Sequence, residues 1–121
     1  MSYLDLEVFI ENLERVGFKV RDAGLLEAAL SRAKTSIFGA DAYVGLEMKA
    51  AAMTHSLIKN HALFDGNKRA AWFALNAFLL MNGFTLLSSQ DEAFDLILSV
   101  ANDQIELQGI ALWITAHMQP A

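Results

Sequence analysis

Hydrophobic residues recur along most of the chain with the three- and four-residue spacing of an amphipathic α-helix. This periodicity predicts six helices, which cover residues 6–16, 22–34, 44–60, 67–82, 89–101 and 110–117. Local signals support several of these boundaries. Gly17 is a natural stop for the first helix, and Asn82-Gly83 is a C-terminal cap for the fourth. The segment from Ser89 to Glu92 has the form of a capping box and opens the fifth.

The segment between the second and third predicted helices follows a different pattern. It reads TSIFGADAYVG, in which Gly39 and Gly45 bracket aromatic and β-branched residues. Such a composition is typical of a loop or a short hairpin. The chain has one proline, Pro120, so little else interrupts the helices. The predicted fold is therefore all-α, a compact six-helix bundle with one short loop or β-hairpin.

The fourth predicted helix is almost entirely apolar. From Ala70 to Met81, Asn76 has the one polar side chain among twelve, and a helix that is apolar all round is expected to be buried. We therefore expect the bundle to surround this helix as its buried centre. Directly before it, residues 61–69 read HALFDGNKR, and charge is costly to place beside a buried element. This conflict marks residues 61–69 as the best candidate for a functional site.

Composition limits the classes of protein to consider. A chain of 121 residues with 55% hydrophobic and 19% charged residues suits a single globular domain, residues 1–121. No uninterrupted apolar run reaches the roughly eighteen residues of a membrane span. A formal net charge of −5 disfavours direct binding of nucleic acid. The chain has no cysteine and no secretory signal at its N-terminus, which favours a cytoplasmic protein.

The residues around the start of the fourth helix form a candidate anion site. Gly66 permits a tight turn, and the amides of Asn67, Lys68 and Arg69 are among those that open the helix without an internal acceptor. Such a helix terminus carries partial positive charge and binds anions. Lys68 and Arg69 add two full charges, and Lys59 adds a third from the end of the previous helix. The phosphates of a nucleotide would make these cations tolerable in a buried setting.

Two further side chains suggest chemistry at the same place. Asp65 is a carboxylate among anion-binding groups, which a Mg²⁺ ion held jointly by carboxylate and phosphate oxygens would explain. His61 follows Leu57 in the helical phase of the third helix, so we expect it to point toward the core. An imidazole is suited to accepting a hydroxyl proton near neutral pH. Together these groups indicate a phosphoryl or nucleotidyl transferase.

Each of these residues also has a structural interpretation. His61 can be a structural or merely exposed histidine, and Asp65 can be the N-cap of the fourth helix. Lys68 and Arg69 can form a solvated first turn, although cations at a helix N-terminus oppose the helix dipole. The residues alone leave these alternatives open.

The stretch from His61 to Arg69 resembles the signature of the Fic/Doc family, and specifically its death-on-curing (Doc) branch. Fic enzymes carry H-P-F-x-[DE]-G-N-G-R-x-x-R, whereas the Doc branch has lysine at the second glycine and lacks the last arginine. This chain has Lys68 and Trp72 at those positions. The segments GLLEAAL, FGADAY, KAAAMTHSLIKNH and FLLMNGF are also similar to this branch, so the resemblance covers about residues 24 to 117.

The resemblance implies a toxin of a toxin–antitoxin pair that blocks translation. The Doc branch is associated with ATP-dependent phosphorylation of a threonine on elongation factor Tu. Most Fic enzymes instead transfer AMP to a hydroxyl, which is the alternative activity, and a catalytically inactive fold that only binds a partner is a third possibility. The partner in this family is an antitoxin (Phd-like) whose tail folds as a helix onto an apolar groove.

Carried over residue by residue, the resemblance implies His61 as the base and Asp65 as the ligand of Mg²⁺. It implies that Asn67, Lys68 and Arg69 bind the phosphates of ATP, beside which our own interpretation adds Gly66 and Lys59, and that residues 36–43 form the flap that holds the target's backbone. The chain departs from the family pattern at Ala62 and Leu63, where proline and phenylalanine are usual, and at Ala70, where threonine is frequent. Leu63 is still expected to anchor the loop in the core.

Three other polar or aromatic features are expected to be structural. We expect His55 to be exposed on the surface, His117 to be structural, and Asn76 to be hydrogen-bonded within the core. Trp72 and Trp113 are expected to pack in the core instead of stacking on a ligand.

Overall fold

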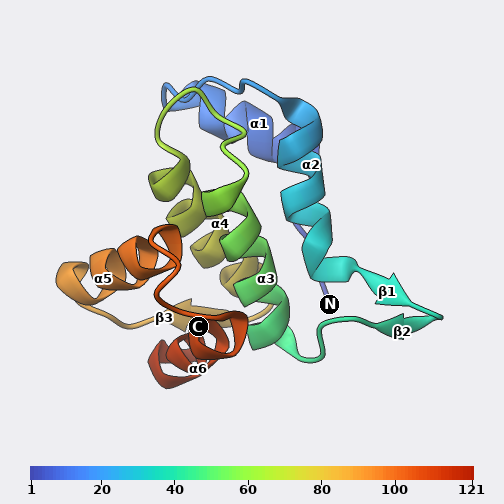
Figure 1. Cartoon of the computed structure of the whole chain (residues 1–121), viewed down its shortest axis with the longest axis vertical. Helices are drawn as coiled ribbons and strands as arrows, with labels where there is room; N and C mark the ends of the chain where they lie inside the picture. The colour runs from blue at the N-terminus through green and yellow to red at the C-terminus, as the bar shows by residue number, and fades with distance from the viewer.

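The order of helices along the chain agrees with the periodicity of the sequence. A computed structural model describes all 121 residues (Figure 1). Its helices are α1 (Leu6–Arg15), α2 (Ala23–Ser31), α3 (Leu46–Lys59), α4 (Asn67–Met81), α5 (Gln90–Ala101) and α6 (Leu107–His117). A short 3-10 turn, Arg32–Lys34, extends α2. The all-α fold class and the six predicted helices are therefore confirmed.

Side-chain caps explain where three of the helices begin. Asp5 accepts a hydrogen bond from the amide of Val8 at the start of α1, and Asp22 accepts one from Leu25 at the start of α2, both at 3.0 Å. Ser89 and Glu92 form the predicted reciprocal capping box at α5. Each such cap is worth about 1 kcal/mol.

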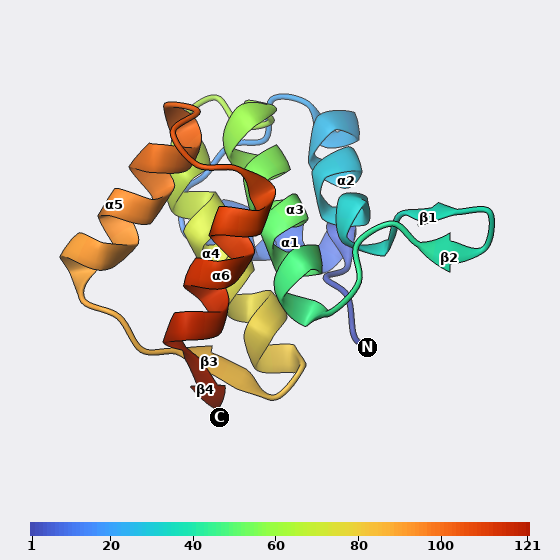
Figure 2. The same ribbon diagram turned by 60° about the horizontal axis from the view of Figure 1, so that its bottom comes forward.

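The segment between α2 and α3 is a hairpin, as its sequence indicates. Strands β1 (Ser36–Ile37) and β2 (Ala40–Asp41) pair antiparallel and project from the helical body (Figures 1 and 2). Phe38 and Gly39 form the turn with φ of 51° and 82°, the left-handed conformations that two-residue hairpin turns require. Phe38 is fully exposed at the tip. We call residues 36–43 the flap.

Two basic residues attach the base of the flap to the helical body. Lys49, on α3, is buried, and its ammonium group lies 3.1 Å from the carboxylate of Asp41. Arg32 donates from Nε to the hydroxyl of Tyr43 at 3.0 Å. Both contacts tie the second half of the flap to α2 and α3, so the flap's base is fixed while its tip is free.

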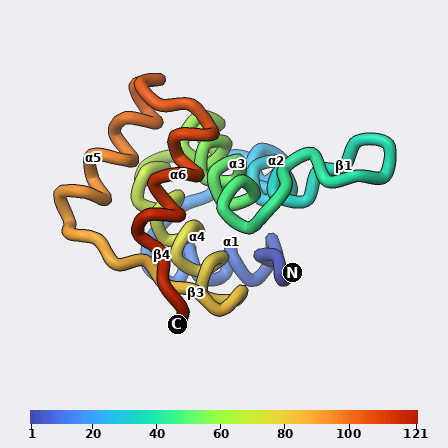
Figure 3. The backbone as a smooth tube through the Cα atoms, turned by 90° about the horizontal axis from the view of Figure 1, so that it is seen from below, coloured from blue at the N-terminus to red at the C-terminus, as the bar shows by residue number.

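A second pair of strands was not expected from the sequence. Strands β3 (Phe84–Leu86) and β4 (Met118–Pro120) pair antiparallel and join the end of α4 to the end of α6 (Figure 3). The two strands are separated by more than thirty residues, and no turn between them signals the pairing. Sequence patterns report local contacts, so a pairing of this kind is not visible to them.

The most enclosed helix is α3, not α4. Nine of the fourteen residues of α3 are buried, and it packs against α2, α4, α5 and α6. Helix α4 is buried on one side only, while Phe73, Leu80 and Met81 are 39%, 61% and 44% exposed. The expectation that the fourth helix is the buried centre is therefore corrected. The apolar composition of α4 reflects an exposed apolar surface in addition to the core.

Part of that surface is a groove between α4 and the N-terminal segment. Apolar side chains from both elements line it: Tyr3, Leu4, Val8, Phe9, Phe73, Ala77 and Met81. No helix has the length and apolar composition needed to cross a membrane.

His117 ties the end of α6 to the start of α5. Its Nδ1–H donates to the carbonyl of Trp113 at 2.7 Å, its Nε2 lies 3.1 Å from a carboxylate oxygen of Glu92, and its ring stacks on Trp113. The bond to the Trp113 carbonyl, with a smaller contribution from Glu92, raises the pKa of His117 above its usual value. The expected structural role of His117 is confirmed.

This arrangement makes part of the stability depend on pH. A raised pKa in the folded state means that the stabilisation is full below the unfolded pKa of histidine, about 6.5, and is lost as the pH rises through the folded value. A bond from the backbone N–H of Ser89 keeps the pKa of Glu92 low, so Glu92 stays ionised through this window. We expect a His117→Gln variant to lose more urea resistance at about pH 5.5 than at about pH 8. Glu92→Gln should weaken the same pH dependence. An equal loss at both pH values would contradict a protonated His117.

Candidate functional site

The loop between α3 and α4 is held in place by a segment from far along the chain. Residues 61–66 form this signature loop, which lies beside the linker of residues 17–22 between α1 and α2 (Figure 1). Val20 and Leu63 form an antiparallel bridge, and the carbonyl of Lys19 accepts from the amide of Phe64 at 3.1 Å. The carbonyl of Ala62 accepts from the amide of Arg21 at 2.8 Å. The loop is therefore a fixed element of structure.

Leu63 and Asn67 secure the loop from inside. Leu63 is buried, as is Ala62, so the leucine anchors the loop as predicted despite the departure from the family pattern. The side chain of Asn67 clasps Leu63, because its Oδ1 accepts from the Leu63 amide at 3.0 Å and its Nδ2 donates to the Leu63 carbonyl at 3.1 Å. The Asn67 side chain is thus used within the protein, and its backbone amide is the group left for an anion.

His61 lies at the mouth of the site and is exposed. The expectation that it points toward the core is wrong, because α3 ends at Lys59 and the helical phase does not continue to residue 61. His61 has a φ of 51°, a left-handed conformation that costs a non-glycine residue about 1 kcal/mol or more. Its carbonyl accepts two hydrogen bonds from the guanidinium of Arg21. No local sequence pattern identifies Arg21, because this contact depends on the tertiary pairing of the linker and the loop.

The start of α4 has the open amides expected of an anion site. Gly66 adopts a φ of 79°, and a Cβ atom there would lie 2.4 Å from Cε1 of Phe18. The first backbone hydrogen bond of α4 is donated by the amide of Ala70 to the carbonyl of Gly66 at 2.9 Å. The amides at positions 67–69 therefore have no acceptor in the protein. Unpaired amides at a helix N-terminus attract a negative charge.

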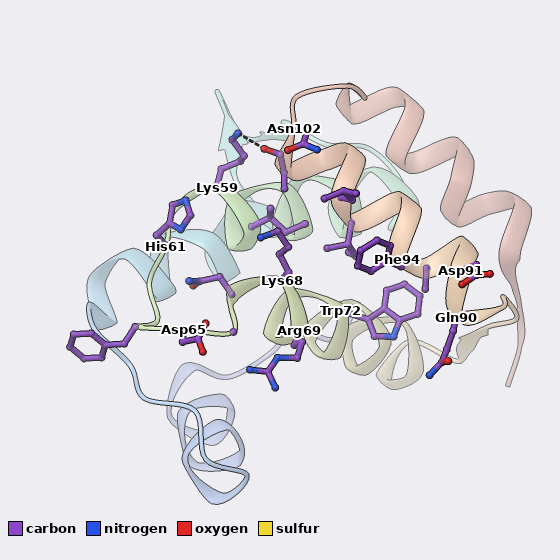
Figure 4. A pocket seen from close by; sticks show the side chains of 18 residues that line it. Lys59, His61, Asp65, Lys68, Arg69, Trp72, Gln90, Asp91, Phe94 and Asn102 are labelled. Atoms are coloured by element: carbon purple, nitrogen blue, oxygen red, sulfur yellow. Dashed lines mark hydrogen bonds between the residues drawn. The ribbon is translucent and has the colours of Figure 1, made fainter.

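The three predicted cations lie differently around these amides. Lys68 and Arg69 are both exposed and both line the cleft, but Lys68 extends toward its middle, whereas Arg69 lies on the opposite side of the start of α4 from Lys68 (Figure 4). The Arg69 guanidinium lies over the Phe18 ring at 5.2 Å. The Lys59 ammonium donates to the carbonyl of Ala101 at 3.2 Å and pairs with Asp103 at 2.9 Å. Lys59 lines the cleft, but its charge is directed toward the end of α5. Its phosphate-binding role stays a prediction.

Asp65 is a free carboxylate at the edge of the site. It is exposed, and Gly66 is the N-cap residue of α4, with no side-chain capping bond. The alternative in which Asp65 caps the helix is therefore wrong. No group of three or more His, Cys, Asp or Glu side chains is placed to hold a metal ion. A single carboxylate fits Mg²⁺, which is commonly bound through one or two carboxylates together with phosphate oxygens.

These side chains open onto one cleft of about 1070 Å³ between the signature loop, α4 and α5 (Figure 4). Its volume is at the upper end of the range for small-molecule sites. The wall contributed by α5 was missing from the sequence prediction, and it includes Gln90, Asp91, Phe94, Leu98 and Asn102 from α5 and its ends. These residues carry no motif, so only the packing of α5 against the body reveals them.

Trp72 also lines the cleft, although it was expected in the core. It is half-buried and meets Trp113 edge-on at 6.2 Å between ring centroids, so it both packs and faces the cleft. Asn76 donates to the carbonyl of Trp72 at 2.9 Å, which confirms its hydrogen-bonded, structural role.

His55 was expected on the surface, and this is wrong. It is half-buried on α3, and its Nδ1 accepts a hydrogen bond from Arg32 at 3.0 Å. Burial, followed by the nearby charges of Arg32 and Lys59, lowers the pKa of His55. His55 is therefore a neutral acceptor that fixes the arginine that also holds the flap.

Comparison with known proteins assigns the chain to a family. The model of the Fic/DOC family matches residues 5–79, which include the flap and the whole signature loop. The chain is also similar to a protein named Toxin Doc from Mycolicibacterium smegmatis. The two are 50% identical over 95 residues, which cover 77% of this chain and 73% of that relative. With the signature loop in place before α4 and lysine at position 68, the chain belongs to the Fic/DOC family and, within it, to the Doc branch.

Proposed function

We propose that this chain is a Doc-type toxin that transfers a phosphoryl group from ATP to a protein hydroxyl. A threonine of elongation factor Tu is the first target to test, with a block of translation as the result. The observation that carries the proposal is the arrangement of the cleft, in which His61 and Asp65 flank the open N-terminus of α4. The similarity to a protein named Toxin Doc supports the same conclusion.

The chain offers complementary groups for the nucleotide. The amides of residues 67–69 would receive phosphate oxygens, and Lys68 and Arg69 would balance their charge. Asp65 would hold Mg²⁺ at the same phosphates, where the ion neutralises developing negative charge. The aromatic and aliphatic side chains of α5, with Trp72, leave a partly apolar wall for the base of the nucleotide.

His61 would act on the target hydroxyl. Its imidazole makes no hydrogen bond within the protein, so it is free to accept the hydroxyl proton. The hydroxyl oxygen then forms a bond to the γ-phosphorus, the bond from that phosphorus to the β–γ bridging oxygen breaks, and ADP leaves. The flap precedes α3 and His61 follows it, so the two lie at opposite ends of that helix (Figure 1), and the flap would hold the target's backbone away from the reacting hydroxyl.

Lys68 is the residue that would select phosphoryl over AMP transfer. A glycine there leaves space for the phosphates to lie deep along the loop with the α-phosphate toward the target. A lysine fills that space and adds a charge, so the γ-phosphate would face the hydroxyl instead. Reaction follows the phosphorus that lies in line with the attacking oxygen.

We expect Lys68→Gly to lose most of the phosphoryl transfer and to gain at most weak AMP transfer, because Trp72 stands where Fic enzymes have a second arginine. Lys68→Met keeps most of the side-chain volume without the charge and separates the two effects. The measurement is transfer to purified elongation factor Tu from ATP labelled at the α or the γ position. Transfer of α-label by the parent would favour the AMP transferase. Growth arrest without any label transfer would favour an inactive fold that acts by binding.

An antitoxin partner is part of the same proposal. The groove between α4 and the N-terminal segment is lined mostly by apolar side chains, so we propose it as the binding site of a Phd-like antitoxin segment. A segment of this kind would cover the exposed Phe73 and Met81.

A further inference from the structure

The backbone pairing that fixes the signature loop stops one residue short of His61. The backbones of Ala62 and Phe64 are hydrogen-bonded to the linker of residues 17–22, and the backbone of Leu63 between them is bonded to the side chain of Asn67. None of these contacts reaches His61, whose left-handed backbone decides where its imidazole points. The position of His61 therefore needs a contact of its own.

That contact is the guanidinium of Arg21. Nε of Arg21 donates to the carbonyl of His61 at 3.0 Å, and Nη2 donates to the same oxygen. The backbone of Arg21 is fixed at the same time, because its amide donates to Ala62 and the next residue, Asp22, caps α2. Arg21 thus links His61, which the backbone pairing does not reach, to the fixed start of α2.

We propose that Arg21 is a positioning residue that holds His61 in its left-handed conformation with the imidazole at the mouth of the cleft. The inference rests on the proposed function of His61 as the base. It assigns Arg21 no contact with ATP or the target. The two parallel donors of a guanidinium suit this task, because they fix both the distance and the direction of the carbonyl. A lysine would supply one charge without the fork.

The contact between Arg21 and His61 lies at the surface, so its effect on the position of His61 can be measured separately from its effect on the stability of the fold. Arg21 and His61 are both exposed, so water replaces the bond when the arginine is removed, and the core is untouched. Misplacing a catalytic group by about 1 Å costs on the order of a hundredfold in rate. The loss of Arg21 should therefore affect the reaction far more than the fold.

The test compares Arg21→Gln, Arg21→Lys and Arg21→Ala with Arg15→Gln, which removes an exposed arginine of α1 that donates only to Asn12. We expect Arg21→Gln to lower kcat about tenfold or more, with little change in KM for ATP or in the unfolding midpoint. Arg21→Lys should recover part of kcat, and added guanidinium ion should partly restore Arg21→Ala but not His61→Ala. An unchanged kcat in Arg21→Gln, or an equal loss in Arg15→Gln, would overturn the proposal.

A second readout does not depend on activity. The chain has three histidines, so the ring signal of His61 can be assigned in an NMR spectrum by its absence from His61→Ala. We expect Arg21→Gln to move or broaden that signal and to leave those of His55 and His117 in place. If the signal moves but the parent transfers no label, the positioning role holds and the proposed kinase activity fails. If the signal does not move, the positioning role fails.

Discussion

Replacing His61 with alanine is expected to abolish growth arrest and to lower the rate of transfer by about a hundredfold to ten-thousandfold, the range for removal of a general base. The imidazole is exposed and makes no hydrogen bond in the protein, so its loss leaves no cavity and breaks no internal contact. Histidine is commoner than alanine at positive φ, so alanine at the φ of 51° adds a small backbone cost.

The measurement is a transfer assay together with an unfolding curve for the same preparation. His61→Asn is a matched variant, because asparagine tolerates a left-handed backbone and keeps a polar side chain but is not a base near neutral pH. We expect both variants to unfold close to the parent and both to be inactive. A fully toxic His61→Ala protein would show that another group removes the proton.

The second large effect is expected at Gly66. An alanine there would place its Cβ 2.4 Å from Cε1 and 2.9 Å from Cδ1 of Phe18, on a backbone with a φ of 79°. The left-handed conformation costs about 1 kcal/mol and the overlap a further 1–3 kcal/mol, so we expect a loss of about 2–4 kcal/mol in the free energy of unfolding. The displaced Phe18 ring contacts the Arg69 guanidinium, and Phe18 belongs to the linker that holds the loop in place, so transfer activity should fall as well.

Gly83→Ala provides the control for Gly66→Ala. Gly83 follows the other end of α4 with a φ of 91°, and nothing lies within 4 Å of a Cβ atom built there. The Gly83→Ala variant should therefore lose about 1 kcal/mol in the free energy of unfolding, from the backbone conformation alone, and should keep its activity. Adding Phe18→Ala to Gly66→Ala should restore part of the activity. If the two glycine variants lose the same stability, the contact with Phe18 does not matter.

The sequence predicts those parts of the fold that depend on neighbouring residues. The helices follow from the spacing of apolar residues, and the capping box at Ser89 and the glycine after Asn82 fix two boundaries, because these signals act within one turn. The open amides of residues 67–69 are predictable for the same reason, because they follow from where α4 begins. The pairing of β3 with β4 is invisible to such patterns, because it joins residues far apart in the chain.

The errors at the candidate site have specific physical causes. His61 was placed by extending the phase of α3, although the helix ends two residues earlier. The apolar composition of α4 was taken to mean complete burial, although apolar residues also form exposed grooves. His55 was expected to face water, whereas Arg32, from a distant segment, occupies that place.

The contribution of α5 to the cleft affects how active copies of such genes are identified in genomes. The family match ends at residue 79, before α5 begins at Gln90. A reading frame interrupted between these points would retain every signature residue and would still be recognised as a family member, yet its protein would lack one side of the cleft. An inventory of active copies therefore has to require the downstream helix through Asn102 as well as the signature.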